Sequence, residues 1–165
     1  MVNKEIFLEI EGMGIVFYSN EAMADIAEGD NFFNKEFASP QNVAEHIKKG
    51  DIIGVNVGSS GSYYLHIRQG YPSEEMIRDY PIGVRLALNV IGDRVSFIDL
   101  YWLMEWSEFV PEEQTIEIEE GIYHISIVTR KPMSGVWGDN QDIYIYFEKI
   151  AKMPELTWDS VPLLF

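Results

Sequence analysis

The sequence predicts a mainly β fold, an antiparallel β-sandwich-like core with a small helical cap in the first third of the chain. After Gly50, apolar residues recur with a period of two in several short segments that turn residues separate, as expected for half-buried strands. Before Gly50, the chain carries its clearest helix-capping signals. A total of about eight or nine short strands is typical of a sandwich or a curled antiparallel sheet.

The first third predicts two strands and then the helical cap, over residues 20–49. Strands are expected at residues 3–10 and 15–18, on either side of a glycine turn. The cap then contains a short helix at 21–27, an aromatic loop at 28–37 and a longer helix. Ser39 and Pro40 start the longer helix as N-cap and first helical residue, and Gly50 closes it.

The remaining two thirds predict strands joined mostly by hairpin turns. Glycine or acidic turn residues separate the segments, and hairpins are expected around residues 91–93 and 120–121. The expected strands cover residues 52–57, 63–68, 83–90, 94–103, 115–119, 122–129 and 142–150. With no internal repeat and no linker, residues 1–165 are expected to form a single domain.

Composition fits a packed globular domain. Of 165 residues, 47% are hydrophobic and 13% aromatic, and the apolar runs are too short to cross a membrane. The N-terminus reaches an acidic residue before any apolar stretch of signal-peptide length, so we expect a cytoplasmic protein. The absence of cysteine excludes disulfides and thiolate metal sites.

The charge of the chain is the most informative part of its composition. Twenty-seven acids against 12 Lys and Arg residues give a net charge of −15. Residues 95–129 contain eight acids and no Lys or Arg. Such a field repels nucleic acid and anionic membranes and attracts basic proteins, although acidity also serves solubility alone. We therefore expect a basic protein partner, no nucleic acid and no membrane.

No catalytic or cofactor motif is complete. The glycine-rich segments at residues 12–14 and 58–62 lack the residues that a dinucleotide or phosphate loop requires. The three histidines have no metal-binding spacing, although His66 and His124 could meet across a sheet. We therefore predict no catalytic residue, no metal, no cofactor and no enzymatic activity.

Two aromatic segments stand out as candidate binding elements. Residues 99–106 are apolar on both faces if extended, which predicts either a buried central strand or a strand that offers one face to a partner. The loop at residues 131–139 holds Trp137 between glycines, where an aromatic side chain serves as a binding anchor or folds back over the core.

Residues 120–145 carry a resemblance to a known family. Glu120-Gly121-Ile122-Tyr123 opens a strand, a glycine-rich loop follows, and Asp142-Ile143-Tyr144-Ile145 returns. This arrangement resembles the end of the competence protein J family, small acidic β-rich inhibitors of a DNA-entry nuclease, and similar hairpins occur in acidic bacterial immunity proteins. The resemblance implies an inhibitor that masks a basic enzyme, without catalytic residues of its own.

The leading hypothesis is an acidic binding protein, an inhibitor or immunity protein that masks a basic partner such as a nuclease or toxin. The residues predicted to bind this partner are Glu105, Glu108, Glu112, Glu113 and Trp137. One alternative is a small-ligand or carbohydrate-binding β domain that uses Trp137, Tyr63 and Tyr64. Further alternatives are an enzyme of unrecognised type and a structural subunit.

Overall fold

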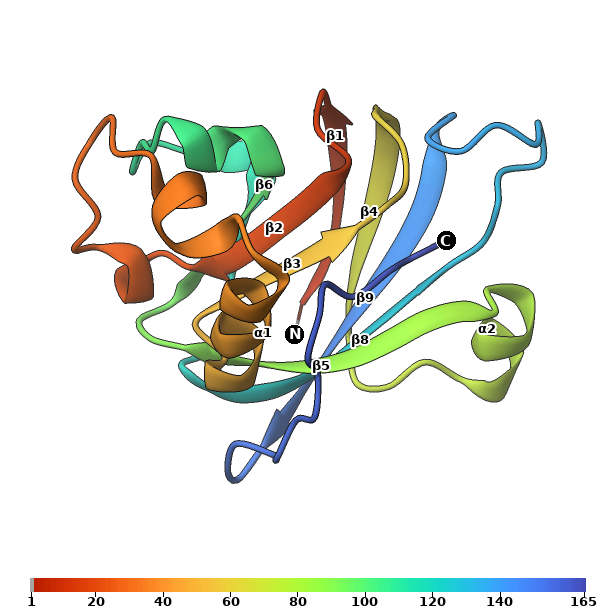
Figure 1. Cartoon of the computed structure of the whole chain (residues 1–165). Helices are drawn as coiled ribbons and strands as arrows, with labels where there is room; N and C mark the ends of the chain where they lie inside the picture. Colours follow the sequence, from red (N-terminus) through yellow and green to blue (C-terminus); the bar gives the residue numbers. More distant parts are fainter. Residues whose placement is uncertain (1) are drawn as a thin grey trace.

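The computed structural model describes residues 2–165, and its strands form two sheets (Figure 1). The five-stranded sheet contains, in spatial order, β1 (Asn3–Ile10), β4 (Gly61–Gln69), β9 (Gln141–Ile150), β8 (Gly121–Thr129) and β5 (Ile82–Val90). The four-stranded sheet contains β3 (Ile52–Asn56), β2 (Gly14–Ser19), β6 (Arg94–Asp99) and β7 (Thr115–Glu117). The predicted mainly β, sandwich-like fold is confirmed.

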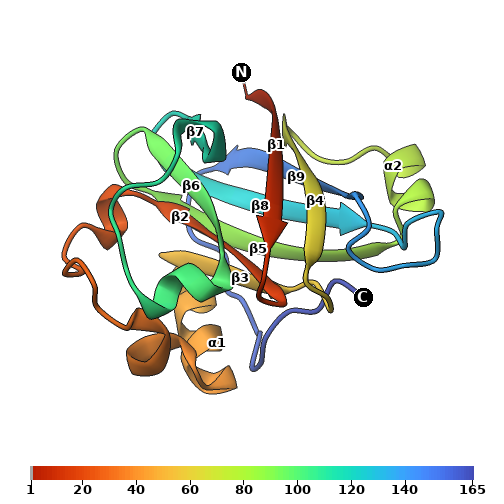
Figure 2. The same ribbon diagram turned by 90° about the horizontal axis from the view of Figure 1, so that it is seen from above.

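Helical segments are short and lie mostly beside the four-stranded sheet (Figures 1 and 2). They are the 3-10 turn η1 (Glu21–Met23), the π-helical turn η2 (Phe33–Phe37), the α-helices α1 (Pro40–Lys49) and α2 (Glu74–Asp79), and the 3-10 turns η3 (Leu100–Met104) and η4 (Glu112–Gln114). No helix in residues 2–165 has both the length and the apolar composition to cross a membrane.

The two sheets share one hydrophobic core. Strand β1 shows the predicted alternation, with Ile6, Leu8 and Ile10 buried. Phe17 of β2 lies 6.4 Å, between ring centroids, from Phe147 of β9, so the aromatic rings of the two sheets meet in the interior. Period-two burial on β1 follows because only one face of that strand meets the opposite sheet.

The helical cap covers the outer face of the four-stranded sheet. Strand β2 is therefore buried along its whole length, on both faces. Phe37 of η2 packs against β3 at Gly54, where an added Cβ would lie 2.7 Å from the ring, so only glycine fits. The helix α1 forms as predicted, because Ser39 accepts the N–H of Asn42 and Gly50 takes the left-handed conformation at its end.

The strand pairing corrects two expectations. The expected hairpins at 83–103 and 115–129 do not form, because β5 and β8 belong to the five-stranded sheet while β6 and β7 belong to the other. Their short loops instead carry the chain from one sheet to the other. One pair, β4 with β9, is parallel, while the other strand pairs are antiparallel.

Two segments of the chain also differ from the predicted secondary structure. The expected helix at 21–27 is reduced to the 3-10 turn η1. The expected strand at 94–103 ends at Asp99, and η3 replaces the extended structure expected for residues 99–106. The exposed aromatic surface described below follows from this early end.

Candidate functional site

Asp99 ends β6 and turns the chain outward. This residue is 4% exposed, and its carboxylate accepts the backbone N–H groups of Glu11 at 2.8 Å, Gly12 at 3.2 Å and Tyr101 at 3.2 Å. A buried carboxylate is stable only when such donors satisfy it, and here they come from two parts of the chain. The bond from Tyr101 caps η3, whose short repeat buries Leu103 and exposes Tyr101, Trp102 and Met104.

The segment after η3 forms one wall of a surface hollow of about 390 Å³, which we call the aromatic hollow. Phe109, the most exposed of its rings, has 74% of its surface open to solvent. The principal residues that line the hollow are Tyr18, Tyr101, Trp102, Glu105, Trp106 and Phe109. Residues 99–106 were expected to form either a buried central strand or a strand that offers one face to a partner, and they instead form a turn whose rings Tyr101 and Trp102 are exposed. The turn η3 lies at one side of the molecule (Figure 2).

Trp106 anchors this segment to the helical cap. Its side chain is 3% exposed and its ring lies 5.2 Å from Tyr18 and 6.1 Å from Phe32, between centroids. Its backbone N–H donates to the backbone carbonyl of Asp30 at 2.8 Å, and its own carbonyl accepts the backbone N–H of Gly29 at 2.7 Å. The indole Nε1, in contrast, is buried without a hydrogen-bond partner among residues 2–165.

Of the four predicted glutamates, Glu105 lines the hollow and the other three follow in the chain segment that borders it. Glu108 and Glu112 adjoin the lining residues Phe109 and Pro111. All four, Glu113 included, are exposed, and within residues 2–165 none of their carboxylates forms a salt bridge. The nearby cation Lys4 instead donates to the backbone carbonyls of Glu112 and Thr115, at 3.2 and 2.5 Å.

Trp137 lies apart from these glutamates. Its loop, between β8 and β9, and the turn η3 lie on opposite sides of the molecule in both views (Figures 1 and 2). The side chain is partly buried, and Nζ of Lys131 is 6.0 Å from its ring centroid. Next to it, Gly138 is fixed by bonds to Ser62 and Gln141. A partner with one flat surface therefore cannot contact both Trp137 and the glutamates.

Trp137→Ala should lower the free energy of unfolding by no more than about 1 kcal/mol, as for a surface substitution. Trp106→Ala serves as the control and should cost about 3–5 kcal/mol, because that ring is buried. Urea denaturation of both variants measures the difference. A loss of about 3 kcal/mol or more at Trp137 would mark it as a core residue.

The residues of the carbohydrate alternative separate in the structure. Tyr63 is fully buried, its hydroxyl donates to the carbonyl of Ser59 at 2.5 Å, and burial raises its pKa to about 12. Tyr64 is 40% exposed on the outer face of the five-stranded sheet, next to Phe7. Tyr63 is therefore a core residue and contributes to no ligand surface.

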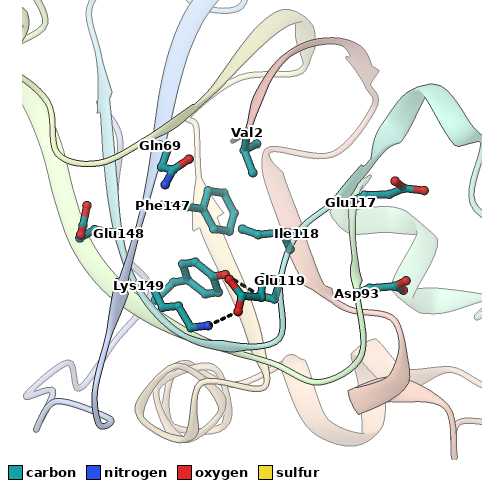
Figure 3. Close-up of a pocket in the computed structure, with 10 residues that line it drawn as sticks. Val2, Gln69, Asp93, Glu117, Ile118, Glu119, Phe147, Glu148 and Lys149 are labelled. Carbon is teal, nitrogen blue, oxygen red and sulfur yellow. Dashed lines mark hydrogen bonds and ion pairs between the residues drawn. The ribbon is translucent and has the colours of Figure 1, made fainter.

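A second hollow, of about 420 Å³, lies at the end of the sandwich where β1 begins (Figure 3). Acidic side chains border it, including Asp93, Glu117 and Glu148. Among the described residues that line it, the lysine is Lys149, which pairs with Glu119 at 2.9 Å, and that hydrogen bond raises the pKa of Lys149. Most of its polar edge is therefore negative, like the rim of the aromatic hollow.

The histidines lie on separate strands and helices. His66 contacts Glu5 on β1 and Asp142 on β9, the latter at 2.7 Å, while His124 accepts or donates a hydrogen bond at 2.7 Å to Tyr71. The two do not meet, since β9 lies between their strands. Among residues 2–165, no group of three or more His, Asp or Glu side chains has metal-binding geometry.

His46 of α1 is part of the helical cap and packs near Trp106 of the aromatic hollow. Its ring lies 5.6 Å from Phe32, which in turn packs on Trp106. Burial lowers the pKa of His46, but the hydrogen bond to Asp51 at 2.9 Å and the charges of Asp51 and Glu36 outweigh burial and raise the pKa above 6.5. Protonated His46 thus stabilises the fold below pH 6.5, and this contribution is lost as the pH rises through the raised pKa.

His46→Asn should therefore cost more stability at low than at neutral to high pH. The difference in free energy of unfolding between the wild type and this variant should shrink between about pH 5.5 and about pH 8.5. Urea denaturation at each pH gives this difference. A difference that stays constant across the range would show that the charge of His46 does not contribute.

Comparisons with known proteins identify a shared fold. No family model and no curated sequence matches the chain. Among solved structures, ComJ from Bacillus subtilis, an inhibitor of the DNA-degrading activity of NucA, aligns with a TM-score of 0.55 at 12% identity, over 91% of this chain and 100% of ComJ. The product of crocagin biosynthetic gene J aligns with a TM-score of 0.56 at 11% identity, over 88% of this chain and 98% of its own. The predicted resemblance to competence protein J is confirmed at the level of the fold.

Proposed function

We propose that this chain is a cytoplasmic, non-enzymatic inhibitor or immunity protein that binds a basic partner, a nuclease or toxin, and masks its cationic site. The observation that carries the proposal is the aromatic hollow with unpaired carboxylates along its border. Exposed aromatic rings are frequent binding anchors, and the surrounding charge selects a partner of opposite sign. The fold shared with ComJ, a nuclease inhibitor, supports the same class of function.

The docking surface that we propose consists of η3 and the segment of residues 105–120, which we call the acidic loop. Seven acids lie in these sixteen residues without a Lys or Arg. Glu119 pairs with Lys149, but the other six have no salt bridge within residues 2–165, so a cationic partner would relieve the repulsion among them. Trp137, on the opposite side, would contact only a partner that extends around the molecule.

Assays with basic nucleases test the proposal directly, and the first to assay is a nuclease encoded beside the gene for this chain, where the genome has one. Purified chain should inhibit the DNA cleavage by this nuclease with a defined stoichiometry. Lysozyme, a basic protein of unrelated function, is the control for nonspecific attraction and should bind only weakly at physiological salt. Undiminished cleavage at saturating concentrations of the chain would contradict an inhibitory function.

A further inference from the structure

The aromatic hollow contains two kinds of group that suit a cationic side chain. Trp102 and Tyr101 are 40% and 47% exposed, so part of each ring is open to solvent. Glu105 lines the same hollow with a carboxylate that forms no salt bridge within residues 2–165. Aromatic rings attract cations over their faces, and a carboxylate beside them pairs with the same charge.

Trp106 also lines the hollow, and its indole N–H is the third group on which the inference depends. This donor is buried and has no acceptor among residues 2–165, which is costly for a folded protein. An aliphatic side chain from a partner would leave the donor unpaired, whereas a main-chain carbonyl would satisfy it. Solvent does not reach the N–H in the free protein, so pairing requires some movement of side chains in the hollow. Phe109 is 74% exposed, so its ring is the one in the hollow that least neighbouring structure holds in place.

We propose that the aromatic hollow receives one arginine of the basic partner, with the guanidinium between the exposed rings and Glu105 and a neighbouring carbonyl oxygen as acceptor for the Trp106 N–H. This inference rests on the proposed function and specifies what the partner presents. It adds to that function a defined pocket for one side chain, in place of a diffuse attraction between charged surfaces.

Arginine fits these groups better than lysine does. The guanidinium is planar, weakly hydrated and able to stack on an aromatic ring while its N–H groups pair with a carboxylate. The lysine ammonium is a compact and strongly hydrated charge, which loses more on entering a hollow lined largely by rings. The hollow should therefore discriminate between the two cations, which a surface that acts by net charge alone would not do.

Short peptides test this inference without the partner. The four tryptophans give four indole N–H signals in a proton–nitrogen correlation spectrum, and single Trp→Phe variants assign them. Titration with acetyl-Gly-Arg-Gly-amide should shift the signals of Trp102 and Trp106 and leave those of Trp137 and Trp158 unchanged. The citrulline peptide, uncharged but of the same shape, should cause no shift, and the lysine peptide a weaker one. Glu105→Gln should weaken the response to the arginine peptide severalfold.

Trp106→Phe separates the role of the N–H from that of the ring. The loss of the unpaired N–H costs no hydrogen bond, but the smaller ring leaves a cavity, so this variant should melt several degrees below the wild type and still fold. It should bind the arginine peptide more weakly, as measured by the shift of the Trp102 signal. Trp158→Phe, which removes an N–H that donates to the carbonyl of Arg85, is the matched control and should bind the peptide normally. Equal responses to the arginine and citrulline peptides, or no shift at Trp106, would overturn the inference.

The outcome with the partner protein distinguishes the two proposals. If Glu108, Glu112 and Glu113 are required for binding the partner but Glu105→Gln and Trp106→Phe bind it normally, the proposed function stands and the arginine pocket is wrong. If the arginine peptide binds as described and no basic partner is inhibited, the pocket stands and the inhibitory function is wrong.

Discussion

Phe17→Ala should lower the free energy of unfolding by about 3–5 kcal/mol. Phe17 is fully buried, and its ring stacks on Phe97 of the same sheet with 5.1 Å between centroids. It also meets Phe147 of the opposite sheet, so the substitution opens a cavity between the two layers of the sandwich. Urea denaturation at one pH, with the slope of the transition checked against the wild type, measures the loss.

Phe7→Ala is the matched control for this prediction. Phe7 is 46% exposed on the outer face of the five-stranded sheet, where it contacts Tyr64. The same chemical change should cost about 1 kcal/mol or less there. Similar losses at Phe7 and Phe17 would contradict the assignment of the core to the space between the sheets.

The second large effect concerns the acidic loop. Replacing Glu108, Glu112 and Glu113 together with Gln should slow association with the basic partner about tenfold at low salt and change the dissociation rate much less. Exposed charges guide the encounter over a distance, whereas close packing in the complex controls dissociation. The melting temperature should hold or rise slightly, because the substitutions remove repulsion between like charges.

A variant that loses three carboxylates outside the acidic loop shows whether the place of the charges, and not only their number, affects the association rate. Glu74 and Glu75 of α2 and Glu155 near the C-terminus are exposed and lie outside the acidic loop. Replacing these three with Gln changes the net charge equally and should slow association much less. Equal effects of the two triple variants would mean that net charge, and no defined surface, attracts the partner.

The sequence predicted correctly those helices and strands whose formation is determined by residues close to them in the chain. The bounds of α1 follow from Ser39, Pro40 and Gly50, whose capping chemistry acts within one turn of the helix. The alternation of β1 likewise required only that one face of that strand be buried. The exposure of Glu105, Glu108, Glu112 and Glu113 could be anticipated, since charged side chains rarely lie unpaired in a core.

Contacts between distant residues account for the errors. A hairpin and a crossing between sheets use similar short turns, so periodicity alone could not separate β5 from β6. The end of β6 depends on Asp99 and N–H groups of residues 11 and 12, far away in the chain. An apolar run on both faces predicted a strand, either buried or with one face open to a partner, whereas the 3-10 geometry of η3 exposes Tyr101 and Trp102.

The candidate site could be predicted only in part, because the hollow also depends on contacts between residues that are distant in the sequence. The acidic loop is a local run of charge and is visible in the sequence. The hollow beside it also requires Tyr18 from β2 and Ile98 from β6, which only the folded sheet brings to Trp106. The unpaired indole N–H of Trp106 is a tertiary property, and the sequence carries no signal for it.

The association rate with the basic nuclease or toxin that the chain inhibits, measured across a salt series, tests whether the acidic loop docks the partner. Exposed charges act over about 10 Å at 0.1 M salt and over much shorter distances at 1 M. The rate for the wild type should therefore fall steeply as salt increases, the rate for the variant at Glu108, Glu112 and Glu113 should fall less, and the two should converge at high salt. A rate that neither salt nor these three substitutions change would show that the acidic loop is ordinary surface and that the partner docks elsewhere.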